Sequence, residues 1–198
     1  MSIGIIGAGN IGGAIATALA RKGIAATIAN RSGPDSLAAF VAGLGGVISA
    51  GTLQQAAAQE IVFVAVPWSK IPGALAGLDL TGKIVVDANN AIEAPLFQAI
   101  DLHGRTSSEV FADLVPGAKV VKAFNHLQPG LLTADPQGEG GARVLFYSGD
   151  DVQAKSTIGS IIAQLGFFGI DLGTLAVGSR LVQFPGGPLP GLNLVKFG

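Results

Sequence analysis

The chain has 198 residues, a length that predicts one domain, or one domain with a small appendage. Charged residues make up only 13% of it, against about 25% in an average domain, and the net charge is −1. This balance excludes the strongly basic surface of a nucleic-acid-binding protein, so we expect no nucleic-acid partner. The absence of cysteine excludes disulfides, thiolate catalysis and cysteine-ligated metals.

In the first half of the chain, short apolar runs alternate with helical patterns. The run "IVFVAV" from residue 61 is apolar and rich in β-branched residues, which is typical of a strand buried on both faces. Pro34 stands in the first turn of one predicted helix, and Pro72 interrupts another. The pattern predicts strands at residues 2–6, 25–29, 47–49, 61–66 and from 83 onward, with helices at 11–21, 34–44, 53–58 and 70–78.

The second half continues this alternation. Thr106 and Glu109 form the capping box of a helix that ends near residue 114, and Asp150 or Asp151 opens a helix that ends near residue 165. Strands are predicted from residues 118 ("AKVVKAF"), 143 ("RVLFYSG") and 167 ("FFGIDL"), and a last helix at 174–182. We expect a long surface loop at 128–142, which is rich in proline and glycine, and an irregular tail from residue 184.

Alternating strands and helices predict the α/β class: a doubly wound, mainly parallel sheet with helices on both faces. One glycine-rich turn, "GAGNIG" at residues 7–12, lies between the first predicted strand and the first predicted helix. Gly7 permits a tight turn, Gly9 lets the backbone approach a pyrophosphate, and Gly12 lets the helix pack against the strand. The phosphates would meet the free N–H groups of that helix. We therefore predict a Rossmann domain that binds a dinucleotide, the alternative being a tight turn without a ligand.

The residues after the second predicted strand indicate which dinucleotide is bound. NAD-binding chains place an acidic residue there, which accepts hydrogen bonds from the adenosine ribose. This chain instead has Asn30, Arg31 and Ser32, so the carboxylate that would repel a 2′-phosphate is missing. The planar guanidinium of Arg31 can pair with phosphate and lie over adenine. We therefore predict NADP(H) rather than NAD, unless Arg31 is simply a solvated loop residue.

The chain lacks several familiar catalytic arrangements. Its single tyrosine, Tyr147, is followed four residues later by Asp151 and not by the lysine of short-chain dehydrogenases. His103 and His126 have no metal-ligand spacing, so we expect surface or loop residues and no metal site. Only about 26 residues follow the last predicted strand, too few for a helical domain with a catalytic lysine. Hydride transfer between two redox cofactors fits, because the protein then only positions their rings and excludes water.

Several stretches together carry a resemblance to a known family. They are "GIIGAGNIGGAIA", "IANRSGPDSL", "VFVAVPW", "VVDANN" and "VVKAFNH", with looser agreement at "LFYSGDD" and "FPGG". In this order they resemble the NADP oxidoreductases that depend on the deazaflavin coenzyme F420, and are similar to the oxidoreductase domain of the STEAP metalloreductases. The resemblance implies hydride transfer between NADP(H) and F420 or a flavin.

The resemblance also implies a set of cofactor-binding residues. Phosphates would face the glycine turn, the 2′-phosphate would face the loop after the second strand, and the nicotinamide would lie at the carboxyl ends of later strands. Trp68 could equally pack against a loop, Asn89 and Asn90 could be turn residues only, and Asn125 could orient the carboxamide or cap its loop. The expected set is Gly7, Gly9, Asn10, Ile11, Gly12, Asn30, Arg31, Ser32, Val66, Pro67, Trp68, Ala88, Asn89 and Asn125.

These predictions leave the acceptor and the partners open. The acceptor could be F420, FMN, FAD or a small carbonyl compound, and two alternatives are a non-catalytic NADPH sensor and a structural nucleotide. We expect residues 1–172 to form the NADP-binding domain and 173–198 to complete the acceptor site or a dimer contact. The low charge and the apolar segment 192–197 favour a homodimer. No uninterrupted apolar stretch approaches the length of about 20 residues that a membrane span needs. We therefore expect no membrane partner and a cytoplasmic location.

Overall fold

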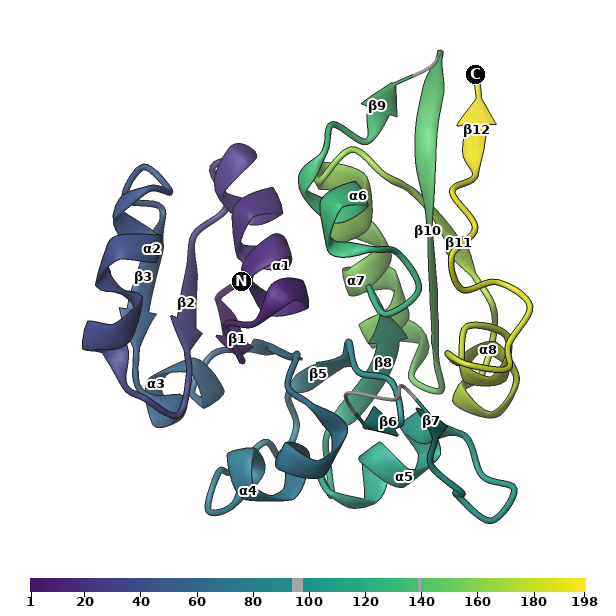
Figure 1. The fold of residues 1–198 in the computed structure, drawn as a ribbon, viewed down its shortest axis with the longest axis horizontal. Helices are drawn as coiled ribbons and strands as arrows, with labels where there is room; N and C mark the ends of the chain where they lie inside the picture. Colours follow the sequence, from purple (N-terminus) through teal and green to yellow (C-terminus); the bar gives the residue numbers. More distant parts are fainter. Residues whose placement is uncertain (94–97, 139) are drawn as a thin grey trace.

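The computed structural model describes residues 1–93, 98–138 and 140–198. Within these ranges the main sheet has ten strands, and eight of them follow one another in the order β11-β10-β8-β5-β4-β1-β2-β3 (Figure 1). Six are parallel: β3 (Ile48–Gly51), β2 (Ala26–Ala29), β1 (Ile3–Ile6), β4 (Ile61–Val64), β5 (Ile84–Asp87) and β8 (Lys119–Ala123). β10 (Gly141–Gly149) is antiparallel to β8, and β11 (Phe168–Asp171) is parallel to β10. The mainly parallel, doubly wound Rossmann sheet is thus confirmed.

The central strands are buried on both faces, which explains why their sequences are apolar without alternation. All four residues of β1 and all four of β4 are buried, and Ile3 lies opposite Ile61 in their parallel register. Successive side chains point to opposite faces, so each strand contributes to two separate cores. Phe63 of β4 packs edge-to-face on Phe124, with ring centroids 5.5 Å apart.

Helices cover both faces of the sheet (Figure 1). One core joins the sheet to α1 (Asn10–Arg21), α6 (Pro129–Thr133) and α7 (Val152–Gln164), with Leu37 of the 3₁₀ turn Pro34–Leu37 that precedes α2 (Ala38–Ala42). The other core holds side chains of α3, α4, α5 and α8. Their bounds are Leu53–Ala57, Ile71–Leu75, Ser107–Asp113 and Leu175–Leu181. The predicted capping box of Thr106 and Glu109 is present at the start of α5.

Two predictions for the later part of the chain are wrong. Residues 128–142 do not form a surface loop: α6 packs on α1, buries Leu132, and is tied to Arg21, whose Nη1 donates to the carbonyl of Thr133 at 2.6 Å. A short strand, β9 (Gln137–Gly138), follows, and residue 139 lies outside the described ranges. The tail is not irregular to its end either, because β12 (Val195–Phe197) pairs antiparallel with β10. Pro129 at the first position of α6 is a helix-start signal that the overall glycine and proline content obscured.

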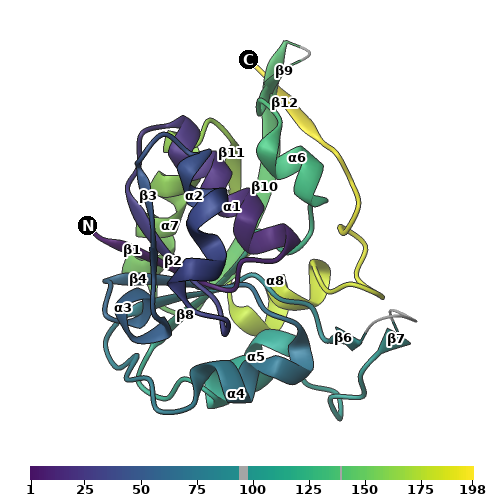
Figure 2. The same ribbon diagram turned by 60° about the vertical axis from the view of Figure 1, so that its left-hand side comes forward.

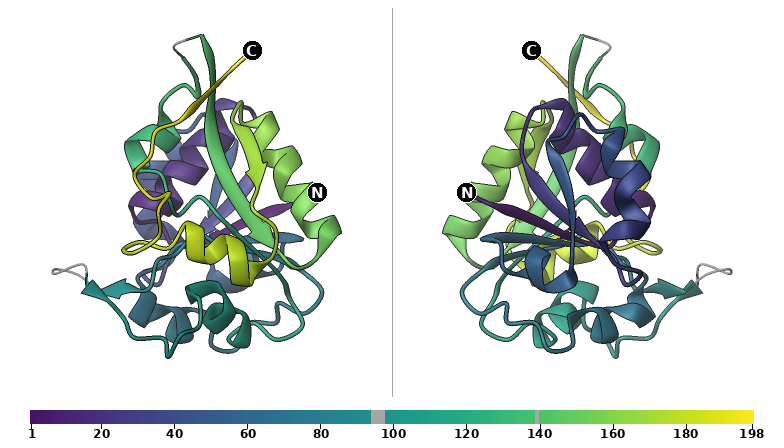
Figure 3. Two further views of the ribbon diagram at one scale, coloured as in Figure 1. Left: turned by 90° about the vertical axis from the view of Figure 1, so that its right-hand side faces the viewer. Right: turned by 90° about the vertical axis from the view of Figure 1, so that its left-hand side faces the viewer.

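The far end of β10 forms an arm with β9 and β12. Both short strands pair antiparallel with its first residues, at Gly141 and Ala142. Figures 2 and 3 show this arm extending beyond the body of the sheet, next to the C-terminus. A two-stranded hairpin of β6 (Ile92–Glu93) and β7 (Gln98–Ala99) was not expected from the sequence. No helix in the described ranges is long and apolar enough to cross a membrane.

The two histidines both lie outside helices and strands, as expected, but they differ in exposure. His103 is exposed, whereas His126 is only 3% exposed and its ring lies 4.9 Å from that of Phe146. The described residues contain no group of three His, Cys, Asp or Glu side chains that could hold a metal ion. Burial lowers the pKa of His126 to about 4, against a smaller opposing effect of a backbone hydrogen bond at Val144.

We predict that His126 makes the fold acid-sensitive. Below pH 6.5 the unfolded chain binds a proton at this imidazole, whereas the folded chain does so only near pH 4. The free energy of unfolding should therefore fall by up to about 3 kcal/mol as the pH drops through this window. His126→Phe keeps an aromatic ring beside Phe146 and should flatten that pH dependence in urea unfolding. An unchanged slope in the variant would contradict the assignment.

Candidate functional site

The fold creates a crevice where the order of the parallel strands reverses. β1 lies between β2 and β4, and the chain leaves β1 toward one edge of the sheet and later returns to β4 on the other side. Ligands of open α/β sheets bind at such switch points, beyond the carboxyl ends of the strands. The glycine turn follows β1 here, and residues from Ala65 onward follow β4. Two hollows lie at this point.

The glycine turn has the geometry that its spacing predicts. Gly7 has φ +106°, a conformation that L side chains rarely adopt. A Cβ atom at Gly12 would overlap the carbonyl oxygen of Gly7, so helix α1 can approach the turn only because Gly12 lacks one. A Cβ at Gly9 would meet no atom within 4 Å, which leaves the space above the turn open. Gly9 caps α1 without a side-chain hydrogen bond, and the first turn of α1 contains no acidic residue.

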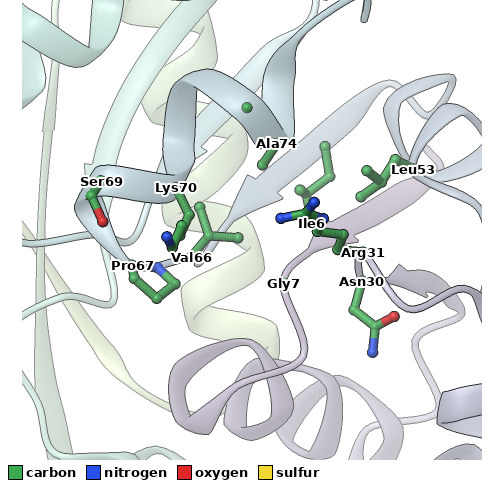
Figure 4. Close-up of a pocket in the computed structure, with 11 residues that line it drawn as sticks. Ile6, Gly7, Asn30, Arg31, Leu53, Val66, Pro67, Ser69, Lys70 and Ala74 are labelled. Atoms are coloured by element: carbon green, nitrogen blue, oxygen red, sulfur yellow. The ribbon is translucent and has the colours of Figure 1, made fainter.

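The first hollow, which we call the adenosine cavity, has a volume of about 520 Å³. Arg31 and Lys70 enter it from different elements, the loop after β2 and the turn before α4 (Figure 4). Within the described residues neither cation is paired, and no carboxylate lines the cavity. Its lining residues are Ile6, Gly7, Asn30, Arg31, Leu53, Val66, Pro67, Ser69, Lys70, Gly73 and Ala74. Such a cavity attracts an anion.

The loop after β2 is held in shape by its own hydrogen bonds. Asn30 Nδ2 donates to Ser36 Oγ at 3.0 Å, and Ser36 Oγ donates to the carbonyl of Gly33 at 2.7 Å. Gly33 has φ +85°, which a glycine adopts without strain. Ser32 is exposed on this loop but does not line the cavity. The loop therefore presents Arg31 on a fixed backbone.

The second hollow, which we call the nicotinamide cavity, has a volume of about 300 Å³. It adjoins the adenosine cavity, because Val66 and Pro67 line both. None of its described lining residues has a side chain that titrates near neutral pH, so it offers no acid or base. They are Gly9, Asn10, Ile11, Ala65, Val66, Pro67, Trp68, Ala88, Asn89, Asn90 and Ile92.

A fully buried ion pair lies beneath this cavity. Lys122 Nζ of β8 is 3.1 Å from Asp87 Oδ2 of β5, and neither side chain is exposed. Lys122 Nζ also donates to the carbonyl of Asn89, while Ser108 Oγ donates to Asp87 Oδ2 at 2.6 Å. Asp87 Oδ1 accepts from the backbone and side-chain nitrogens of Asn89, and Asn89 Oδ1 accepts from Val66 N at 2.9 Å. Burial lowers the pKa of Lys122, and the attraction of Asp87 opposes this.

A second polar link connects the nicotinamide cavity to the C-terminal segment. Asn125 Nδ2 donates to Asn90 Oδ1 at 2.9 Å and to the carbonyl of Val182 at 2.7 Å. Asn90 Nδ2 donates to the carbonyl of Asn125, and Phe184 N donates to Asn90 Oδ1 at 3.4 Å. Asn125 is buried behind Asn90 and lines neither cavity. Its Oδ1 atom has no hydrogen-bond partner in the part of the chain that the structure describes.

The structure brings most of the expected site residues into one crevice. Gly7, Asn30, Arg31, Val66 and Pro67 line the adenosine cavity, and Gly9, Asn10, Ile11, Trp68, Ala88 and Asn89 line the nicotinamide cavity. Gly12, Ser32 and Asn125 lie next to the crevice without lining it. Sequence reasoning missed Lys70, Asp87 and Lys122. The sequence does mark Lys122, since a charged residue inside the apolar run "KVVKAF" indicates a buried charge on that strand.

The fold and the crevice are those of a dinucleotide-binding Rossmann domain, and comparisons with known proteins support an oxidoreductase family. The family model described as NADP oxidoreductase, coenzyme F420-dependent, matches residues 2–91. The chain is 32% identical to the metalloreductase STEAP3 of Rattus norvegicus over 187 residues, which are 92% of this chain and 36% of that protein. The chain spans only 20% to 36% of the length of the curated relatives it matches.

Two solved structures agree over nearly the whole chain. A hypothetical protein from Sinorhizobium meliloti has a TM-score of 0.94 and 45% identity, covering 99% of this chain and 96% of its own. A protein assigned as an F420-dependent NADP reductase, from Arthrobacter sp., has a TM-score of 0.75 and 29% identity, covering 88% and 86%. The resemblance to the coenzyme F420-dependent NADP oxidoreductases is thus confirmed, with the family match on residues 2–91.

We predict that Gly12→Ala destabilises the fold while Gly13→Ala does not. The new methyl group at Gly12 would collide with the Gly7 carbonyl, which should cost about 1–3 kcal/mol. At Gly13, one residue along the same helix, the nearest atom is the Phe40 ring at 3.7 Å, and an alanine should stabilise α1 by about 0.5–1 kcal/mol. Thermal unfolding of both variants measures the difference. Equal melting temperatures would contradict the close contact of α1 with the turn.

Proposed function

We propose that this protein transfers hydride between NADP(H) and the ring of a second redox cofactor, a deazaflavin such as F420 or a flavin. The observation that carries the proposal is the pairing of the two cavities. One is cationic and free of carboxylates among its described residues, the other is free of acid–base groups, and Val66 and Pro67 join them. A dinucleotide bound across the switch point would place one of its ends in each cavity.

The adenosine cavity supports binding of the 2′-phosphate of NADP(H). Arg31 presents a planar guanidinium that can take two phosphate oxygens, and Lys70 supplies a second positive charge from the other wall. Asn30 leaves the cavity without the carboxylate that would repel the phosphate. The pyrophosphate fits over Gly9, where a Cβ would fill the open space, and meets the free N–H groups at the start of α1.

The nicotinamide cavity supports transfer to a ring that takes up the hydride from NADPH directly. Hydride transfer to a carbonyl compound needs an acid to protonate the developing alkoxide, and no described lining residue supplies one. A deazaflavin or flavin provides the accepting ring itself, so the protein has to orient the two rings and exclude water. Trp68, Val66 and Ile92 form apolar walls suited to this task.

We further propose that the segment 173–198 completes the acceptor end. The contacts from Asn125 to Val182 and from Asn90 to Phe184 attach this segment beside the nicotinamide cavity. A direct contact between Asn125 and the nicotinamide carboxamide stays a prediction, supported by the unpartnered Oδ1 atom of Asn125. In the simplest form of the proposal Asn125 holds Asn90, and Asn90 faces the ring.

The relatives suggest which acceptors to test first. The family description and the Arthrobacter protein both name F420. The curated relative is a metalloreductase, of which this chain spans 36%, so ferric chelates form a second class of acceptor. A non-catalytic NADPH sensor remains the alternative function, and an open nicotinamide cavity favours the enzyme, because a sensor needs no space for an acceptor.

We predict that Asn30→Asp shifts the cofactor preference toward NADH. The new carboxylate would repel the 2′-phosphate and accept hydrogen bonds from the free ribose hydroxyls, so the ratio of NADPH to NADH affinity should fall by about tenfold or more. Binding titrations with both nucleotides measure the ratio. Asn193→Asp, the same chemical change at an exposed position beside Arg143, is the control and should leave the ratio unchanged. An unmoved ratio in Asn30→Asp would remove this role of the loop.

We predict that NADPH is oxidised by F420 or a flavin when acceptors are tested in parallel. Protein and NADPH are mixed with F420, FMN, FAD or a ferric chelate, and the loss of reduced-nicotinamide absorbance is followed. Gly9→Ala is the matched control: its methyl group meets no protein atom within 4 Å, so the variant should fold normally yet block the pyrophosphate. Binding of NADPH without turnover on any acceptor would support the sensor instead.

A further inference from the structure

The buried pair of Lys122 and Asp87 is difficult to explain by stability alone. Two fully desolvated charges stabilise a fold no better than apolar residues of similar size, because the desolvation cost offsets their attraction. Here both side chains have no exposed surface, and both lie on central strands of the sheet, where apolar side chains are the rule. The charges instead orient their neighbours, because hydrogen bonds fix angles and distances that apolar contacts leave free.

The bonds of this pair lead to the nicotinamide cavity. Lys122 donates to the carbonyl of Asn89, and Asp87 accepts two hydrogen bonds from the same residue, at 3.0 Å and 2.9 Å. Asn89 in turn accepts from Val66 N at 2.9 Å, across the gap between β5 and β4. Asn89 and Val66 both line the nicotinamide cavity. These hydrogen bonds therefore fix the distance between the segment after β5 and the segment after β4, both of which line the nicotinamide cavity.

The adenosine cavity is largely independent of these bonds. Arg31 and Lys70, its two cations, make no contact with Lys122, Asp87 or Asn89 among the described residues. Only Val66 belongs both to the hydrogen-bonded chain and to the adenosine cavity. A change in the ion pair should thus affect one half of a bound dinucleotide far more than the other half.

We propose that Lys122 and Asp87 are positioning residues for hydride transfer: through Asn89 they set the wall against which the nicotinamide ring lies. This inference rests on the proposed function, since it assigns the ring to the nicotinamide cavity. Neither residue touches the cofactor. Their role is to keep Asn89 and Val66 in the geometry that presents one face of the ring to the acceptor.

The test compares the two halves of the cofactor in a charge-neutral variant. Lys122→Met combined with Asp87→Leu removes the bonds to Asn89 without leaving a lone buried charge. Affinity for 2′,5′-ADP, which carries only the adenosine half, should stay within about twofold of the unchanged protein. Affinity for NADPH should fall by about tenfold or more, because the nicotinamide half loses its wall. Trp68, the single tryptophan, lines the nicotinamide cavity, so energy transfer from its fluorescence to the reduced ring should also weaken.

Two further variants keep the test decisive. Lys122→Met combined with Asp87→Asn keeps the side-chain shape at residue 87 without leaving a lone buried charge, and it should show the same selective loss in smaller degree if the first double variant does not fold. Lys155→Met combined with Asp171→Leu removes another ion pair, of 2.9 Å between α7 and β11, away from the crevice. This control should leave the affinities for 2′,5′-ADP and NADPH unchanged.

The outcomes separate this inference from the function on which it rests. If the unchanged protein binds neither 2′,5′-ADP nor NADPH, the proposed function fails. If it binds both and the double variant, or Lys122→Met with Asp87→Asn in its place, retains its NADPH affinity and its Trp68 signal, the positioning role is overturned. An equal loss of both affinities also overturns it, because that result indicates a general effect on the fold.

Discussion

The close approach of helix α1 to strand β1 is the constraint on which the binding crevice depends. It requires glycine at two positions, one for the left-handed turn at Gly7 and one for the contact at Gly12. With the helix this close, its N-terminal N–H groups point into the space beyond the sheet. The adenosine and nicotinamide cavities lie on either side of that point, and both include residues of the glycine turn.

The two ends of the crevice differ in their electrostatics, and the difference matches the two tasks of the site. The adenosine cavity carries two cations that are unpaired among the described residues, and these attract an anion. The other end presents amides and apolar side chains, with its charges buried and neutralised beneath the surface. A reaction in which hydride moves between two rings needs such a neutral environment, because a nearby free charge would favour one redox state of either ring.

The sequence predicted the eight strands that follow one another in the main sheet, the glycine turn and the Asn30-Arg31 loop, because each has a local signature: an apolar run, a fixed spacing, or a position at a strand end. It could not predict the ion pair, since Asp87 and Lys122 are 35 residues apart and meet through the parallel register in which they are direct partners. Lys70 was missed because only the tertiary fold brings it into the cavity that Arg31 also lines. Helix α6 and strand β12 were missed because tertiary packing overrode a composition typical of loops.

The asparagine link between Asn90, Asn125 and the C-terminal segment divides the chain into two functional halves. Residues 6–74 supply everything that lines the adenosine cavity, and the family model ends at residue 91, just past Asn90. In the proposed arrangement the acceptor end draws on residues up to Phe184, which contacts Asn90 from ninety-four positions further along the chain. A change in the second half would therefore leave the described lining of the adenosine cavity untouched, whereas Lys122 ties that half to the wall of the nicotinamide cavity.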